Sequence, residues 1–89
     1  MSCEVGAETV GIIIRVNFNG AGQNAGETIL TLKPDDHPAT PFVIEMDTPP
    51  PKYFRLLQDA LTAMWEIKPV EIASTPWTNL PKITDIRIL

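Results

Sequence analysis

The sequence has one cysteine, Cys3, so no disulfide can form within the chain. Small secreted domains that bury too little core are commonly held together by several disulfides, and this chain therefore does not belong to that class. Its 89 residues suffice for one domain with one core. Because a domain of this size is only marginally stable alone, we expect association with another chain to add stability.

Basic residues are also few. The chain has 7 Lys and Arg against 11 Asp and Glu, which gives a formal net charge of -4. Proteins that bind the phosphates of nucleic acids use clusters of Lys and Arg. The basic residues here are scattered along the chain, so the composition disfavours nucleic-acid binding.

The sequence contains no long apolar run. None approaches the roughly 18 residues that a membrane-spanning helix needs, and the first ten residues lack the basic and apolar regions of a signal peptide. We therefore expect no insertion into a membrane. If Met1 is the native start, the expected location is the cytoplasm, and secretion would require that a signal peptide had been removed.

Alternation of apolar and polar residues, which is typical of β-strands, is present in five segments. It predicts strands over residues 9–19, 27–33, 41–46, 70–75 and 83–89. Gly11 lies near the start of the first strand and is expected to allow a bend or bulge, so that this strand can serve two sides of a barrel. Residues 1–8 are expected to form a flexible N-terminus.

One helix is predicted between the third and fourth strands, over residues 51–67. Asp47 or Thr48 is expected to cap its start, and prolines are tolerated in its first turn because their missing N–H groups would have no partner there. Pro69 is expected to end the helix, since the residue before a proline avoids the α conformation.

The predicted order is therefore three strands, one helix and two strands (β-β-β-α-β-β), in a single domain over residues 1–89. A helix between strands three and four is the arrangement of the OB-fold, a five-stranded Greek-key barrel. We predict an OB-fold-like barrel. An open α+β sheet with the same element order is the alternative.

The predicted helix is unusually apolar around its circumference. At 100° per residue its apolar side chains cover an arc of about 200°, whereas packing on one side of a small barrel needs little more than 100°. We assign the excess to Leu56, Ala60, Ala63 and Ile67 and predict that these residues form an interface with a second copy. The small alanines would let another helix approach closely. Two alternatives are that residues 34–41 fold over this surface and that a different protein binds it.

Nothing in the sequence has a catalytic signature. Cys3 has no base nearby in the sequence, and His37 has no serine or cysteine partner at motif spacing. Asp35, Asp36 and His37 could ligate a metal, but no second cluster supplies the remaining ligands. The glycine-rich segment 20–26 leads into a strand, so no helix N-terminus could receive a phosphate. We predict no enzyme activity, no cofactor and no metal site.

One loop has residues suited to a ligand. Trp77 and Asn79 precede the last strand, where an OB-fold commonly contacts its ligands. An indole ring can stack on a sugar face or a nucleobase, and an amide both donates and accepts hydrogen bonds. The alternative is that Trp77 fills one end of the barrel.

Residues 42–89 resemble the pentameric receptor-binding B subunits of bacterial enterotoxins of the cholera-toxin type. In that family a strand with the pattern F-x-x-E precedes the helix, and here FVIE ends at Glu45. A W-N-N motif follows the fourth strand of the family, and here W-T-N contains Trp77 and Asn79. The resemblance implies an OB-fold, a ring in which the helices surround a pore, and a sugar site at these three residues. The family's disulfide and its polar loop before the helix are missing, and the interval from Glu45 to Trp77 is shorter.

We therefore predict a non-enzymatic module that self-associates through its helix, in a ring or another homo-oligomer, and that binds a carbohydrate or another small polar ligand at Glu45, Trp77 and Asn79. An adaptor that uses the apolar helix face for a different protein is one alternative. A single-stranded nucleic-acid-binding OB-fold, which the acidity disfavours, is another.

Overall fold

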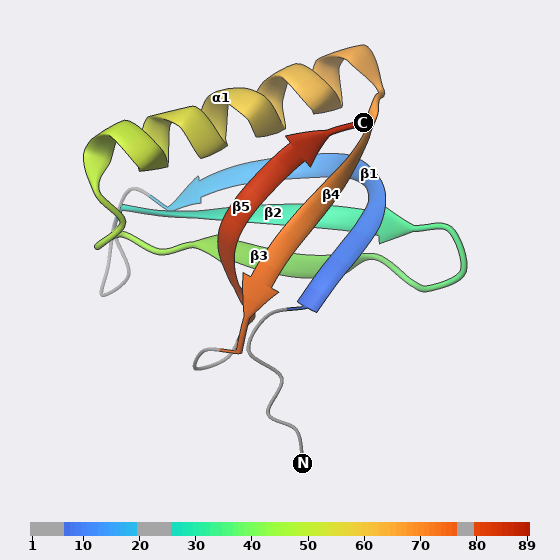
Figure 1. The fold of residues 1–89 in the computed structure, drawn as a ribbon, viewed down its shortest axis with the longest axis horizontal. Coiled ribbons are helices and arrows are strands. Elements are labelled where there is room, and N and C mark those ends of the chain that lie inside the picture. Colours follow the sequence, from blue (N-terminus) through green and yellow to red (C-terminus); the bar gives the residue numbers. More distant parts are fainter. Residues whose placement is uncertain (1–6, 20–25, 77–79) are drawn as a thin grey trace.

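A computed structural model describes residues 7–19, 26–76 and 80–89 of the chain. The elements are β1 (Ala7–Asn19), β2 (Glu27–Pro34), β3 (Thr40–Ile44), α1 (Pro50–Glu66), β4 (Pro69–Thr75) and β5 (Lys82–Ile88). This confirms the predicted order of three strands, one helix and two strands. Figure 1 shows α1 lying across one end of the strands.

The five strands form a closed barrel in the order β1-β2-β3-β5-β4. All neighbouring strands are antiparallel except β3 and β5, which run parallel and pair at Val43 and Lys82. The Val43 N–H donates to the carbonyl of Pro81 at 3.0 Å next to this pair. The structure is therefore mainly β with one helix, an OB-fold-like barrel, and the alternative of an open α+β sheet is wrong.

Closure depends on the bend in β1. Its first part pairs with β4 over residues 7–12, and its second part pairs with β2 over residues 11–19. Gly11 lies where the two pairings overlap, and a bulge follows between Ile13 and Arg15. A Cβ atom on Gly11 would lie 2.5 Å from the carbonyl oxygen of Lys33. The prediction that β1 serves two sides of the barrel is confirmed. Only glycine fits at position 11, because the backbone of β2 leaves no space for a side chain there.

The core lies between the barrel interior and α1. Leu56, Ala60 and Ala63 of the helix are fully buried, and they pack on buried strand residues. The strand residues of this core are Ile13, Leu30, Leu32, Phe42, Ile44, Val70, Ile72, Ile83 and Ile86.

The start of α1 differs from the prediction. The N-cap residue is Pro49, and no side chain caps the helix, so neither Asp47 nor Thr48 has that role. The N–H groups of both residues are used in a turn around Glu45 instead: Asp47 donates to the Glu45 carboxylate at 2.7 Å and Thr48 to the Glu45 carbonyl at 3.0 Å. Pro50 and Pro51 then begin the helix without N–H groups that would need a cap.

Tyr53 links the first turn of α1 to the start of β2. Its hydroxyl donates to the Gly26 carbonyl and lies 2.6 Å from the Thr28 hydroxyl, which is itself fully buried. Because the Tyr53 O–H donates its hydrogen bond to the Gly26 carbonyl, the Tyr53 oxygen accepts the hydrogen bond from the Thr28 hydroxyl. This contact fixes the position of the helix along the barrel.

Replacement of Tyr53 with phenylalanine is expected to lower the free energy of unfolding by about 1 to 3 kcal/mol, because the buried Thr28 hydroxyl loses its partner. Urea denaturation measures the loss. Thr28→Val, made alone and together with Tyr53→Phe, is the control. The losses of unfolding free energy in the two single variants should sum to more than the loss in the double variant. Losses that simply add would contradict a direct bond between the two side chains.

Candidate functional site

The uncovered side of α1 is the most unusual surface of the described residues. Phe54, Leu61 and Trp65 have exposed fractions of 66, 43 and 86 %, and helical spacing places them on the side of the helix away from its buried residues Leu56, Ala60 and Ala63. Leu57 and Met64 lie beside them, partly buried against the core. We call these five residues the outer face of α1. In Figure 1 no other helix or strand of the described residues lies on the side of α1 away from the barrel.

The two sides of the helix are therefore reversed relative to the prediction. Leu56, Ala60 and Ala63 were assigned to an interface between copies, but each has an exposed fraction of 0 % and belongs to the core of the chain itself. That assignment is wrong. The small alanines bring the helix axis close to its own barrel, and the bulky Phe54 and Trp65 are left outside. Of the four predicted interface residues only Ile67 is exposed, at 73 %.

Charge is strictly segregated around α1. Its four charged residues, Lys52, Arg55, Asp59 and Glu66, lie within an arc of about 60° when residues are placed at 100° per step. The outer face lies in the opposite half, and the uncharged Gln58 and Thr62 lie between it and the charged residues. A surface with three large apolar side chains and no charge is typical of a binding surface.

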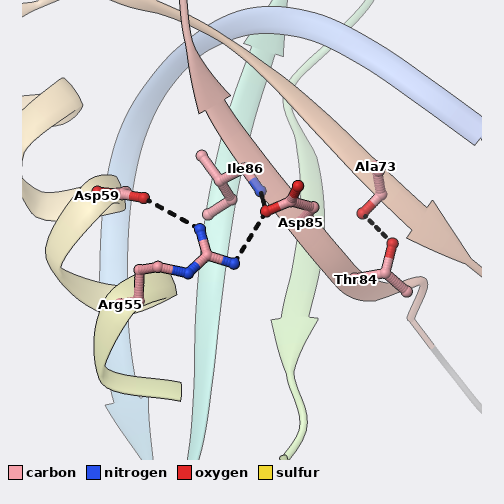
Figure 2. A network of polar contacts seen from close by, with 6 residues as sticks. All are labelled: Arg55, Asp59, Ala73, Thr84, Asp85 and Ile86. Carbon is pink, nitrogen blue, oxygen red and sulfur yellow. Dashed lines mark hydrogen bonds and ion pairs between the residues drawn. The ribbon is translucent and has the colours of Figure 1, made fainter. Parts of the chain in front are cut away.

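The charged side of α1 faces β5, as Figure 2 shows. Arg55 is 3.6 Å from the Asp59 carboxylate and donates a hydrogen bond of 3.1 Å to Asp85, which also accepts the Ile86 N–H. Partial burial acts to raise the pKa of Asp85, but the bonds from Arg55 and Ile86 and the charges of Arg55 and Lys52 outweigh it and lower this pKa. The burial of Leu56, Ala60 and Ala63 sets the rotation of the helix, and these exposed contacts are compatible with it.

The direction of this pKa shift determines the pH range in which the Asp85 contact stabilises the folded chain. A lowered carboxylate pKa favours the folded chain above the ordinary pKa of the group, and the benefit is lost as the pH falls through the lowered pKa of Asp85. The Asp85 side chain is more than half exposed, so the effect on stability is small.

A hollow lies beside the outer face. It has a volume of about 320 Å³ and is lined by Leu61, Thr62, Met64, Trp65 and Glu66. Its walls are therefore largely apolar, and they belong to the last two turns of the helix. The volume is large enough for one aromatic side chain.

Ile67 ends the helix in a strained conformation. Its φ of 54° and ψ of 49° are left-handed, a region that branched side chains strongly avoid. The N–H groups of Ile67 and Lys68 bond to the carbonyls of Met64 and Ala63, so this geometry terminates α1 before Pro69, as predicted. A glycine normally occupies such a position.

Replacement of Ile67 with glycine is expected to raise the free energy of unfolding by about 1 kcal/mol relative to Ile67→Ala. Both variants remove the same exposed side chain, but only glycine relieves the left-handed strain. Thermal unfolding at low protein concentration compares the two without a contribution from association. Equal stability of the two variants would contradict the strain.

The three predicted ligand residues are only partly described. Glu45 follows β3 directly, and its side chain is 12 % exposed. Its carboxylate accepts the Asp47 N–H at 2.7 Å and lies 3.8 Å from the Lys82 ammonium group. Both oxygens of Glu45 thus have partners within the chain. Trp77 and Asn79 lie outside the described residues, and the sugar site remains a prediction.

Two other classes of site lack support in the described part of the chain. Among residues 7–19, 26–76 and 80–89, no group of three or more His, Cys, Asp and Glu side chains is placed to hold a metal ion. In the same ranges no helix is long and apolar enough to span a membrane.

Comparison with known proteins adds no relative. No protein-family model matches the chain, and no match is found among curated proteins or among solved structures. The fold and the outer face of α1 are therefore the observations from which a function can be argued.

Proposed function

We propose that the protein is a non-enzymatic binding and assembly module that self-associates through the outer face of α1. The observation behind this proposal is Trp65, a tryptophan exposed at 86 % on a charge-free side of α1. Tryptophan is among the residues most enriched at the energetic centres of protein interfaces. Its exposure together with Phe54 and Leu61 indicates a surface that another chain covers.

Self-association is favoured over the other partners for a physical reason. An 89-residue chain buries a limited fraction of its surface, and pairing with a copy of itself extends the core without requiring another gene product. The outer face has no charge, so two copies can meet there without repulsion at the centre of the contact even though each has a net charge of -4.

The nucleic-acid alternative receives no support from the described strands. OB-folds that bind single strands stack bases on aromatic side chains, commonly on β2 and β3. In this chain the single aromatic residue of those two strands is Phe42, which is buried in the core. An adaptor role for the outer face and a carbohydrate ligand at Glu45, Trp77 and Asn79 remain alternatives for experiment.

Fluorescence of Trp65 tests the proposed function. In a Trp77→Phe variant Trp65 is the only tryptophan. As the protein concentration rises from nanomolar to high micromolar, we expect its emission to shift to the blue and its quenching by acrylamide to fall, because a second copy removes the indole from water. A variant that also contains Leu61→Lys keeps the reporter, disturbs the face and should show neither change. Emission that is red and fully quenchable at every concentration would contradict self-association.

A further inference from the structure

We propose that two copies of this chain pair with their α1 helices antiparallel, so that Phe54 of each copy packs into the hollow beside Trp65 of the other. This proposal rests on the proposed function, because it names the partner and the register of the same surface. Four features of the outer face lead to it: the spacing of its aromatic residues, the hollow, the flanking charges and the exposed area.

Phe54 and Trp65 are eleven residues apart, which is three helical turns, about 16 Å along the axis and about 20° around it. They therefore lie at opposite ends of the same side. An antiparallel pair with a two-fold axis at the level between residues 59 and 60 places Phe54 of one copy at the level of Trp65 of the other. Both aromatic contacts form at once, as a self-complementary two-fold interface requires.

The hollow gives Phe54 of the second copy a place to dock. It lies between Leu61 and Glu66 along the helix, at the level that this register assigns to the incoming Phe54. Its volume of about 320 Å³ exceeds that of a phenyl ring. A phenyl ring inserted there would contact Trp65 from the side, an arrangement that aromatic pairs favour.

The charges beside the outer face select the antiparallel orientation. Arg55 and Glu66 lie on the same flank of α1, with side chains about half exposed. In the register above, Arg55 of one copy and Glu66 of the other differ in height along the helix axis by only about 3 Å. A parallel two-fold pair would instead place this charged flank against the apolar flank with Leu57 and Met64, where charges lose solvation without gaining partners.

The exposed area is sufficient when the margins are included. Phe54, Leu61 and Trp65 together expose on the order of 400 Å² of mainly apolar surface, given that large side chains present 150–250 Å². Stable interfaces bury about 600 Å² or more on each partner. Gln58, Thr62 and the partly buried Leu57 and Met64 border these residues and supply the difference.

Charge reversal tests the register. Arg55→Glu and Glu66→Arg are each expected to raise the dimer dissociation constant about 5- to 30-fold, because each converts two attractive pairs into repulsive ones. The double variant should return to within about threefold of the original chain. Lys33→Glu, at an exposed position of β2, changes the net charge as Arg55→Glu does and is the control. Circular dichroism confirms that each variant is folded.

Spin labels give a second test that does not alter these charges. Labels are attached to Gln58→Cys or Pro51→Cys in a Cys3→Ser background, at positions that do not line the hollow and are about 20° apart around the helix. The antiparallel register places the two Pro51 labels more than 10 Å farther apart than the two Gln58 labels, whereas a parallel pair gives nearly equal separations.

The outcomes separate the two proposals. If the unmodified chain is monomeric, the proposed function fails. If it self-associates but the charge reversals match Lys33→Glu, or the double variant is weaker than both single variants, or the two label separations are equal, the antiparallel register is overturned and the proposed function stands.

Discussion

Replacement of Trp65 with lysine is expected to weaken self-association by about 30-fold or more. Central aromatic residues of interfaces cost about 2 kcal/mol or more when they are removed, and 1.4 kcal/mol corresponds to a factor of ten in affinity. The new ammonium group would also lose water at the contact with Phe54 of the second copy. Because Trp65 is exposed at 86 % in the single chain, the fold itself should be unaffected. Sedimentation velocity measures the change in affinity.

Val10→Lys is the matched control for this variant. Val10 is also an exposed apolar residue, at 49 %, and the substitution changes the net charge by the same amount. It lies on β1 opposite Glu71 of β4 and is not part of the outer face. Self-association should therefore persist in Val10→Lys. Equal weakening in both variants would show that net charge, and not the outer face, controls association.

Replacement of Gly11 with alanine is expected to lower the free energy of unfolding by about 3 kcal/mol, which corresponds to a fall of roughly 12 to 24 °C in Tm for a domain of this size. The added Cβ would lie 2.5 Å from the Lys33 carbonyl oxygen and 2.9 Å from the Pro34 Cα. Both are backbone atoms, so β1 and β2 would have to move apart where β1 passes from one partner strand to the other.

Val10→Ala tests whether this loss belongs to the bend. It shortens the neighbouring residue of the same strand, whose side chain is half exposed, and should change Tm by only a few degrees. Differential scanning calorimetry compares the two variants. A Gly11→Ala protein with the stability of Val10→Ala would mean that the barrel does not need the close approach at Gly11.

The strand and helix order was predictable because each element has a strong local signal. Alternating apolar residues marked all five strands, and Pro69 correctly placed the end of the helix. Gly11 indicated the bend in β1 from a single residue. Closure of the barrel followed from the element order and is confirmed by the pairing of β3 with β5.

The direction of the helix could not be read from its periodicity. An apolar arc of about 200° shows that the helix has more apolar surface than one barrel needs, but not which end of the arc faces inward. The decision depends on tertiary packing: Leu56, Ala60 and Ala63 fit against the core of the barrel. The sequence did contain a usable signal, because all the charged residues of the helix lie on one side. They border the end of the apolar arc that contains Leu56 and Ala60, and the other end of the arc, with Phe54 and Trp65, is the one that faces away from the barrel.

The prediction of a helix cap failed for a related reason. Asp47 and Thr48 have side chains that commonly cap helices, but α1 begins at Pro50, so the cap position falls on Pro49, which has no side-chain acceptor. Glu45 itself was chosen as a ligand residue from a four-residue motif. Its contacts with Asp47 and Lys82 show that the same carboxylate also has a structural role, which no sequence pattern indicated.

Sedimentation equilibrium of the unmodified protein shows whether the outer face of α1 joins two copies of the chain. The chain has a mass of 9.8 kDa. We predict that the apparent mass rises to twice this value as the concentration increases into the micromolar range, and that Trp65→Lys returns it to the value of the single chain. A mass of 9.8 kDa at high micromolar concentration would show that the chain does not self-associate.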